Sequence, residues 1–340
     1  MTDTLPFRSE PRKILIIKPS SLGDIIHGLP VLAAVAARFP AAEIHWVVGR
    51  GFHQILENHP LIHKLWIIDK NSWKKPFRAF STFSELRALA SGLRLEKFDM
   101  VVDLQGLFRS AMIGLFTGCE DRVGFDAARE GAKFSYKYRI KTEAEIHAVE
   151  KNMRIARFLG CAVQEPEFPF PPLELPPELA ALIPPEYAVI APSAGTLVKR
   201  WPAMHFGYLA SQLTVPSVIV AGKADRDLAD EISVLSNGHA VSLAGKTGLR
   251  ELAAIIKGAK FLVCPDTGPM HIAAALDVPV FAIFGPTSPV RTGPYGKNRT
   301  IIGSDMRCAP CFKRKPCRDW KCMSEISPDR VLAAIRNGLR

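Results

Sequence analysis

The stretch Cys264-Pro265-Asp266-Thr267-Gly268-Pro269-Met270-His271-Ile272-Ala273-Ala274-Ala275 decides the fold, because it predicts a strand, a polar turn and a helix in immediate succession. The apolar residues 261–264 suit a strand covered on both faces, and Gly268-Pro269 lets backbone approach a ligand where a helix begins. The first N–H groups of such a helix are unpaired and favour a phosphate, with Thr267 and His271 one turn apart beside it. The alternative is that Asp266 and Thr267 only cap the helix, and the sequence leaves both open.

Length and composition indicate a folded protein with an anionic partner. The chain has 340 residues, of which 48 % are hydrophobic and 23 % charged, and its formal net charge is +11. This length suits two domains with separate cores, and the charge favours nucleic acid, an anionic membrane surface or a phosphorylated substrate. We find no helix-turn-helix, zinc-finger or aromatic RNA-binding signature, so no nucleic acid is expected as a partner. We also expect a cytoplasmic protein, because residues 1–13 are polar and no apolar run is long enough to cross a bilayer.

Strand-like runs alternate with helical segments in the first half of the chain. Strands are expected at 14–17, 44–48, 65–69 and 100–104. Helices are expected at 24–39, with a bend at Pro30, and at 84–93. This alternation predicts a parallel, doubly wound sheet, so the fold class is α/β.

The alternation stops where prolines crowd at 166–185 and then starts again. Strands are expected at 188–191, 217–220, 261–264 and 280–284, and helices at 203–213, 225–235 and 249–257. We therefore expect a first domain at 1–170, a linker at 171–186, a second domain at 187–326 and a C-terminal helix at 327–340. Ser327 would cap that helix, with Pro328 in its first turn. Polar loops at the carboxyl ends of the strands would face a cleft.

Four motifs in the same order resemble one enzyme family. They are Lys18-Pro19-Ser20-Ser21-Leu22-Gly23-Asp24, Asp103-Leu104-Gln105-Gly106, Lys199-Arg200-Trp201-Pro202 and Asp266-Thr267-Gly268-Pro269-Met270-His271. Together they resemble the ADP-heptose:lipopolysaccharide heptosyltransferases, glycosyltransferase family nine. Ile25-Ile26-His27, Arg122-Val123-Gly124-Phe125-Asp126 and His147-Ala148-Val149-Glu150-Lys151-Asn152 are more similar to the type I enzymes, which add the first heptose to Kdo.

This resemblance implies a GT-B fold, in which two Rossmann-like domains face each other across a cleft. It implies inverting transfer of heptose from ADP-L-glycero-D-manno-heptose to Kdo of the lipopolysaccharide inner core. The partners would be ADP-heptose, Kdo-lipid A and, weakly, the anionic inner face of the inner membrane, with Phe77, Phe80 and Phe83 beside Lys74, Lys75 and Arg78 as the lipid-facing stretch. The alternatives are transfer to another acceptor, such as a second core heptose or a protein, and a nucleotide-binding module without transfer activity.

Inverting transfer needs a base for the acceptor hydroxyl and positive charge for the departing diphosphate. Asp24 suits the base, since it follows a glycine after the first strand and occupies the motif position of the family's proposed base; it would otherwise only cap a helix. Lys199 suits the diphosphate, with Arg200 as its rival. No cofactor is then required for catalysis. We read Asp225 and Asp227 as a helix cap or a ribose contact and not as a metal site.

The remaining site residues divide between donor and acceptor. Binding of the donor is expected from Ser193, Gly195, Thr196, Lys199, Asp225, Asp266, Thr267, Gly268 and His271. Binding of the acceptor is expected from Lys18, Ser20, Ser21, Gly23, Gln105 and Arg122.

Four of the seven cysteines cluster near the C-terminus. Cys308, Cys311, Cys317 and Cys322 form a C-x2-C-x5-C-x4-C pattern, which offers soft ligands for structural zinc or iron. Free thiols are the alternative, because the spacing departs from the common zinc patterns. Cys119, Cys161 and Cys264 are scattered and are expected to be small buried residues.

Overall fold

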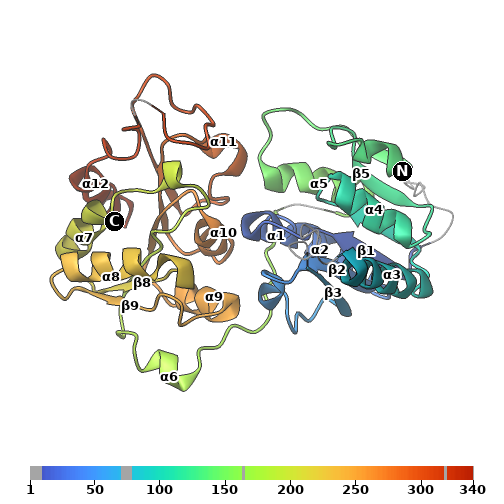
Figure 1. Cartoon of the computed structure of the whole chain (residues 1–340), viewed down its shortest axis with the longest axis horizontal. Coiled ribbons are helices and arrows are strands. Elements are labelled where there is room, and N and C mark those ends of the chain that lie inside the picture. The colour runs from blue at the N-terminus through green and yellow to red at the C-terminus, as the bar shows by residue number, and fades with distance from the viewer. Residues whose placement is uncertain (1–9, 70–78, 163–164, 318–319, 340) are drawn as a thin grey trace. The chain divides into compact units, whose positions relative to one another are not determined.

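A computed structural model of the chain describes residues 10–69, 79–162, 165–317 and 320–339. The chain divides into two compact units, Met1–Pro172 and Leu173–Arg340. Each unit contains a parallel sheet of six strands with helices around it (Figure 1). The segment predicted as a linker contains one short helix, α6 (Pro177–Ala180).

The first unit is built on a sheet in the order β3-β2-β1-β4-β5-β6. Its central strand β1 has four successive apolar residues, from Ile14 to Ile17, that are completely buried, as expected for a strand covered on both faces. The chain moves outward from β1 in one direction and then returns to β4 on its other side, so the strand order reverses between β1 and β4. The strands are β1 (Lys13–Ile17), β2 (Glu43–Gly49), β3 (Lys64–Ile68), β4 (Met100–Asp103), β5 (Arg122–Phe125) and β6 (Tyr138–Ile140).

The helix predicted at 24–39 is two helices, which corrects the expected bend. α1 ends at Ile26 and α2 begins at Leu29, with Pro30 in the first turn of α2, where a missing N–H costs no hydrogen bond. Gly28 lies at the break, where a Cβ would come within 3.0 Å of the Trp46 ring. The helices of this unit are α1 (Leu22–Ile26), α2 (Leu29–Arg38), η1 (His53–Ile55), α3 (Ala79–Leu95), α4 (Phe108–Phe116), η4 (Ala132–Ser135) and α5 (Ala148–Phe158).

The second unit repeats the same strand order, β12-β11-β10-β7-β8-β9. Its core packs the large rings of Trp201, Phe206 and Phe281 against the sheet. The strand order reverses between β7 and β10, which pair in parallel through Leu262↔Val189 and Val263↔Ile190. The strands are β7 (Ala188–Ile190), β8 (Ser217–Ile219), β9 (Ala240–Ser242), β10 (Leu262–Pro265), β11 (Val280–Phe284) and β12 (Arg299–Gly303).

Helices of the second unit follow the predicted periodicity closely. Ser327 caps the last helix as predicted, because its side chain accepts a hydrogen bond of 3.3 Å from the Arg330 N–H. Besides α6 the helices are η5 (Leu197–Lys199), α7 (Ala203–Gln212), η6 (Lys223–Asp225), α8 (Arg226–Leu235), α9 (Leu249–Lys257), α10 (Gly268–Ala275), α11 (Pro289–Thr292) and α12 (Pro328–Gly338).

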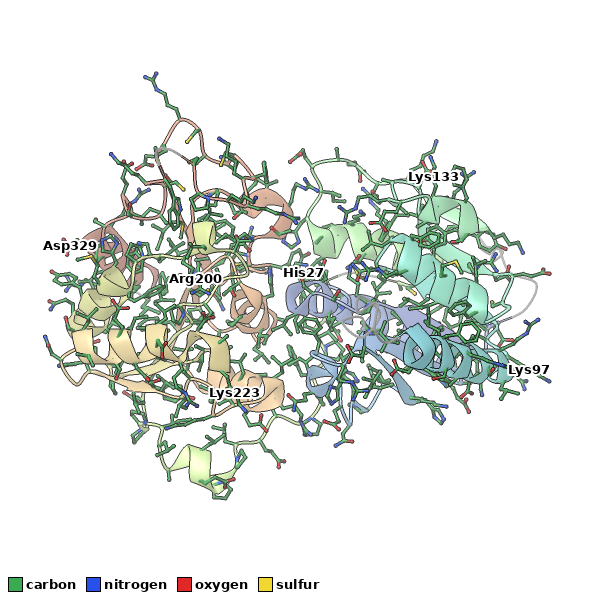
Figure 2. The ribbon with its side chains drawn as sticks, viewed as in Figure 1. His27, Lys97, Lys133, Arg200, Lys223 and Asp329 are labelled. Atoms are coloured by element: carbon green, nitrogen blue, oxygen red, sulfur yellow. The ribbon has the colours of Figure 1, made fainter. Side chains whose placement is uncertain are left out.

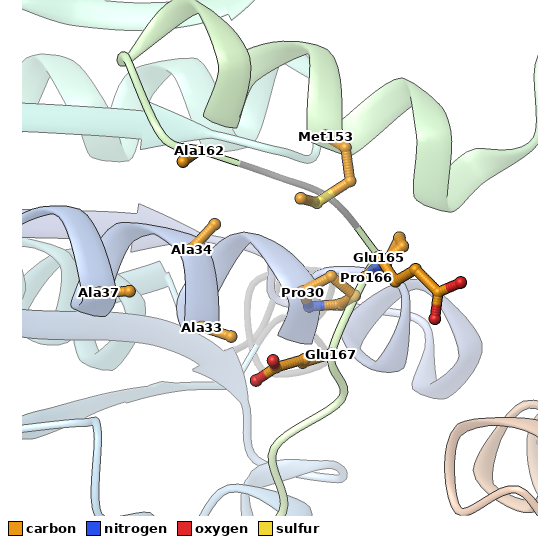
Figure 3. A pocket seen from close by; sticks show the side chains of 9 residues that line it. All are labelled: Pro30, Ala33, Ala34, Ala37, Met153, Ala162, Glu165, Pro166 and Glu167. Atoms are coloured by element: carbon orange, nitrogen blue, oxygen red, sulfur yellow. The ribbon is translucent and has the colours of Figure 1, made fainter.

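A cavity of about 100 Å³ lies in the first unit between α2, α5 and the chain that follows α5 (Figure 3). Three alanines of α2, Ala33, Ala34 and Ala37, line it together with Met153 and Pro166. None of the predicted site residues contributes to its wall. The cavity is therefore separate from the residues predicted to bind substrate.

A buried histidine lies among charged groups near the amino ends of β1, β2 and β3. His45 is 1 % exposed and stacks on His63, with 5.4 Å between the ring centroids. Its Nδ1 accepts a hydrogen bond of 3.2 Å from the Trp66 indole, so the proton of the neutral ring lies on Nε2. Nε2 is 3.9 Å from the Glu43 carboxylate and, among the described residues, has no hydrogen-bond partner. Burial lowers the pKa of His45 to about 4, so the ring is neutral at pH 7.

We expect His45 to make the folded protein less stable as the pH falls from about 6.5 to 4. In this window the unfolded chain protonates His45 and the folded chain does not, so the free energy of unfolding decreases with falling pH. The expected loss from His45 is about 2 kcal/mol between pH 7 and pH 5. Urea unfolding at the two pH values should show a smaller loss for His45→Gln, which can still accept from Trp66 but does not titrate. Equal losses in both proteins would contradict the assignment.

Candidate functional site

In the first unit, two of the motifs meet at the carboxyl edge of the sheet. Ile17 of β1 lies beside Asp103 of β4, and the Leu104 N–H donates a hydrogen bond of 3.1 Å to the Ile17 carbonyl. The residues that follow these strands, from Lys18 and from Leu104, therefore start side by side. This is the point where the strand order reverses, and ligands of open α/β sheets bind at such points.

Lys18 and Asp24 form the charged part of this group. The Lys18 ammonium donates a hydrogen bond of 2.8 Å to the Leu104 carbonyl and lies 3.5 Å from Asp24 Oδ1. The Lys18 side chain is only 7 % exposed, whereas 43 % of the Asp24 side chain is exposed. Lys18 thus holds the carboxylate from the buried side, and the carboxylate faces solvent.

Asp24 also stabilises the start of α1. Its Oδ2 accepts hydrogen bonds from the Ser21 N–H at 2.9 Å and from the Ser21 hydroxyl at 2.7 Å. This is the reciprocal half of a capping box, so the capping role considered for Asp24 is present in the structure. The role does not exclude catalysis, because the capping bonds use Oδ2 and Lys18 approaches Oδ1.

Asp103 builds the loop that carries Gln105, a role that was not predicted from the sequence. Its Oδ1 accepts from the N–H groups of Gln105 at 2.8 Å and Gly106 at 3.0 Å, and its Oδ2 accepts from the Tyr136 hydroxyl at 2.7 Å. Burial raises the pKa of Asp103 and that of Tyr136. The turn brings Gln105 Oε1 within 3.4 Å of the Ser20 N–H. The sequence signal for this turn was an Asp followed three residues later by a Gly, since Asp side chains accept hydrogen bonds from turn backbone. In the structure that glycine, Gly106, has a φ of +67°.

Two other residues predicted to bind the acceptor lie differently. Gly23 is buried within α1. Arg122 is the first residue of β5 and pairs with Val101, two residues before β4 ends, so it lies toward the amino edge of the sheet. Its guanidinium donates to the carbonyls of Ser135 and Cys119. The structure therefore does not bring Arg122 together with Lys18, Ser20 and Gln105.

In the second unit, Lys199 and Asp266 join the two loops at the switch between β7 and β10. Lys199 Nζ lies 2.7 Å from Asp266 Oδ2, and the two side chains are 26 % and 9 % exposed. Thr267 precedes α10 in extended conformation, and within the described chain its side chain makes no capping hydrogen bond. Asp266 pairs with Lys199, so the capping alternative does not describe this turn. The N-terminus of α10 therefore suits an anion, although Pro269 in its first turn contributes no N–H.

The loop after β7 carries two buried hydroxyls, those of Ser193 and Thr196. Ser193 Oγ and Thr196 Oγ1 are buried, and neither has a hydrogen-bond partner among the residues that the structure describes. Between them Gly195 is exposed, and a Cβ added there would contact nothing. Buried hydroxyls without partners are costly unless a ligand or water satisfies them, so these groups fit a polar ligand.

Arg200 points to a different partner from that of Lys199. Figure 2 labels the Arg200 side chain, whose guanidinium lies 2.6 Å from Asp225 Oδ1, in the loop after β8. Asp225 is the residue before α8, yet in the described structure its side chain makes no capping hydrogen bond, and Asp227 lies in the first turn of α8. Arg200 is thus engaged one strand away from the β7–β10 switch, which favours Lys199 as the cation for a diphosphate. His271 is 7 % exposed in α10.

The four clustered cysteines do not form a closed metal site. Cys308 is exposed, Cys311 and Cys317 are half-buried and Cys322 is buried. A metal site needs at least three His, Cys, Asp or Glu side chains with their ligand atoms close together. In the described ranges, the only such group with all ligand atoms within 4.8 Å of one another is Glu43, His45 and His63. The Trp66 hydrogen bond leaves His45 no lone pair for a metal. Burial, and to a lesser degree the other three thiols, raise the pKa of Cys322.

Comparisons with known proteins agree on one family. Residues 86–321 match the family model described as "Glycosyltransferase family 9 (heptosyltransferase)". Lipopolysaccharide heptosyltransferase 1 of Pseudomonas aeruginosa is 32 % identical over 355 residues, covering 95 % of this chain and 97 % of that protein. The structure of Escherichia coli heptosyltransferase WaaC with ADP has a TM-score of 0.78 at 27 % identity, covering 96 % of this chain and 99 % of that one.

The same Escherichia coli enzyme with ADP-2-deoxy-2-fluoro heptose has a TM-score of 0.79 at 26 % identity, over 96 % of this chain and 99 % of that one. These likenesses confirm the predicted fold class, an α/β fold of the GT-B type.

Proposed function

Because this chain belongs to glycosyltransferase family 9, the heptosyltransferases, we propose that it transfers heptose with inversion from ADP-L-glycero-D-manno-heptose to Kdo of the lipopolysaccharide inner core. One observation carries the proposal. Lys199 pairs with Asp266 at the β7–β10 switch, and the loop after β7 also carries the hydroxyls of Ser193 and Thr196, which have no partner among the described residues. A similar Escherichia coli heptosyltransferase was solved with ADP and with ADP-2-deoxy-2-fluoro heptose. In the first unit, Lys18 and Asp24 follow β1, which lies beside β4 at the corresponding reversal of the strand order.

In the proposed reaction Asp24 takes the proton from the acceptor hydroxyl as that oxygen attacks the anomeric carbon. The bond from that carbon to the diphosphate breaks, and ADP leaves. Asp24 suits this role because its carboxylate is ionisable, half-exposed and held in place by Lys18 and Ser21. The loop with Gln105 lies beside it and would orient the acceptor.

Negative charge grows on the departing ADP, and the second unit would stabilise it. The Lys199 ammonium is fixed by Asp266 and can donate its other hydrogens to phosphate oxygens. Ser193, Thr196 and the N-terminus of α10 add uncharged donors. Such groups supply charge stabilisation without a metal, so we propose that catalysis requires no cofactor.

The decisive experiment offers the protein its proposed substrates. Incubation with ADP-heptose and Kdo-lipid A should release ADP and yield a heptosylated lipid, detected by coupled assay and mass spectrometry. Parallel reactions with a mono-heptosylated acceptor and with a protein acceptor test the alternatives. Transfer to either of those acceptors in preference to Kdo-lipid A would overturn the assignment of Kdo as the acceptor. Tighter binding of UDP than of ADP would count against the donor.

We propose a cytoplasmic protein in weak, peripheral contact with the inner face of the inner membrane. The net charge of +11 favours an anionic surface, and no helix in the described part of the chain is long and apolar enough to span a bilayer. Of the stretch predicted to face lipid, residues 74–78 and the side chain of Phe80 lie outside the described residues, and Phe83 is 67 % exposed. Salt should release the protein from anionic vesicles, and retention in high salt would contradict a mainly electrostatic contact.

Structural zinc or iron at Cys308, Cys311, Cys317 and Cys322 stays a prediction. Binding would require the exposed Cys308 and the half-buried Cys311 and Cys317 to close on the buried Cys322. Metal analysis of the purified protein, with the four cysteines changed to serine as the control, tests it.

A further inference from the structure

Thr287 presents a buried hydroxyl that neither the sequence analysis nor the proposed mechanism uses. Thr287 Oγ1 is buried and, within the described residues, has no hydrogen-bond partner. Four hydroxyls of the second unit share this state, those of Ser193, Thr196, Ser217 and Thr287. Ser217 begins β8 at the amino edge of the sheet, whereas the other three lie on loops after β7 and β11 at the carboxyl edge. Thr287 thus belongs with the two hydroxyls placed at the donor.

Position along the edge gives Thr287 a different part of the donor from Ser193 and Thr196. Neighbouring strands run β8, β7, β10, β11, so the loops with Asp225, Lys199, Asp266 and Thr287 follow in that order. Strands are about 4.8 Å apart, so the loops after β8 and β11 leave the sheet about 14 Å from each other. The diphosphate proposed at β7 and β10 occupies the middle of this row.

The ribose falls on the β8 side of that row. Asp225 follows the second strand of its unit, and an acid at that place hydrogen-bonds the ribose in dinucleotide-binding folds. A nucleotide-sugar with its ribose toward β8 and its phosphates at β7 and β10 extends its sugar toward β11. Thr287 is three residues beyond the end of β11.

The loop with Thr287 is held in place on both sides. The Pro286 carbonyl accepts a hydrogen bond of 2.7 Å from the Phe312 N–H. A Cβ at Gly285 would come within 2.6 Å of Met323 Sδ, so the loop packs closely against Met323 at this point. Ser288, the next hydroxyl, is used locally: its Oγ accepts from the Val290 N–H at 3.3 Å and caps α11. The Thr287 hydroxyl is therefore fixed in position and has no hydrogen-bond partner among the described residues, whereas the neighbouring Ser288 hydroxyl caps α11.

We propose that the Thr287 hydroxyl hydrogen-bonds a hydroxyl of the sugar of the donor, so that it selects the nucleotide-sugar over the free nucleotide. The inference rests on the proposed function and extends it, since it assigns a residue to the sugar and leaves ADP binding to Lys199 and the loop after β7. Ser288 supplies a matched control one residue away.

Equilibrium binding without acceptor tests the assignment. Dissociation constants for ADP and for ADP-2-deoxy-2-fluoro heptose would be measured by calorimetry on the full-length protein and on Thr287→Val, Thr287→Ser and Ser288→Ala. Thr287→Val should weaken binding of the fluorinated donor about threefold to tenfold and leave ADP unchanged. Thr287→Ser keeps the hydroxyl and should bind the fluorinated donor as tightly as the unaltered protein. Ser288→Ala should lower the melting temperature and change neither dissociation constant.

Each other outcome has a definite meaning. Equal weakening of ADP and of the fluorinated donor in Thr287→Val would place the hydroxyl on the diphosphate and overturn the sugar contact. Unchanged affinity for both would show that the hydroxyl is no ligand. If the unaltered protein failed to bind the fluorinated donor at all, the proposed function itself would be wrong. That result does not depend on the variants, so it is distinct from a failure of the Thr287 assignment.

Discussion

Asp24→Asn should lower turnover by about 10²–10⁴-fold while the dissociation constant of ADP stays unchanged. An amide cannot take the acceptor proton, so the variant loses an interaction made in the transition state. Asp24 belongs to the first unit and the loops proposed to bind the donor belong to the second, so we expect the ground-state contacts to ADP to stay unchanged. Turnover with saturating substrates and ADP calorimetry measure the two effects separately.

The capping bonds of Asp24 make its control necessary. Asn keeps a side-chain oxygen that can accept from Ser21, so Asp24→Asn should retain most of the cap, whereas Asp24→Ala should also lose about 1 kcal/mol of stability. Asp329, in the first turn of α12, is a matched carboxylate far from the motifs in sequence (Figure 2). Asp329→Asn should alter stability slightly and turnover not at all. Full turnover in Asp24→Asn would leave Asp24 a helix cap and nothing more.

Lys199→Ala should raise the dissociation constant of ADP at least about tenfold. It should reduce turnover by a larger factor than it weakens ADP binding. The charged hydrogen bond it removes is worth about 1.5–3 kcal/mol. Turnover should suffer more than binding, because the charge on ADP grows as the bond to the sugar breaks. Calorimetry with ADP and the turnover assay at saturating donor give the two quantities.

Loss of Lys199 also leaves Asp266, whose side chain is 9 % exposed, without its ion partner. We expect this to cost about 1–3 kcal/mol of stability. The double variant Lys199→Ala with Asp266→Asn removes the unpaired charge and should recover stability without recovering ADP affinity. Arg200→Ala, which breaks the pair with Asp225, should affect ADP less than Lys199→Ala. If Arg200→Ala has the larger effect, the two cations exchange roles.

Local sequence predicted most of the sheet because buried parallel strands are continuous apolar runs. β1, β10 and β11 could be predicted in this way, since β10 and β11 are buried along their whole length and β1 in all but its first residue. Four strands were not predicted: β5, a short strand that contains Arg122 and Gly124, and the edge strands β6, β9 and β12, whose residues are mostly half-buried or exposed and include polar ones. They exist because a neighbouring strand offers hydrogen bonds, which a local pattern does not record.

The site could be predicted as far as loop position determines it. Loops after parallel strands share one edge, so Lys199 and Asp266 were expected together although they are 67 residues apart in sequence. Side-chain partners were beyond reach. The Leu104 carbonyl that binds Lys18 and the carbonyls that engage Arg122 are backbone groups, and any sequence could supply them. Their positions depend on how the strands pack.

The repeated strand order has a consequence for how such proteins diversify. Each unit encloses its own apolar core, one around Leu15, Val47 and Ile113 and the other around Trp201, Phe206 and Phe281. Exchange of gene segments at the boundary after Pro172 would cut neither core nor any sheet. Recombination between related genes at this boundary can therefore exchange one unit while leaving the core and the sheet of the other intact.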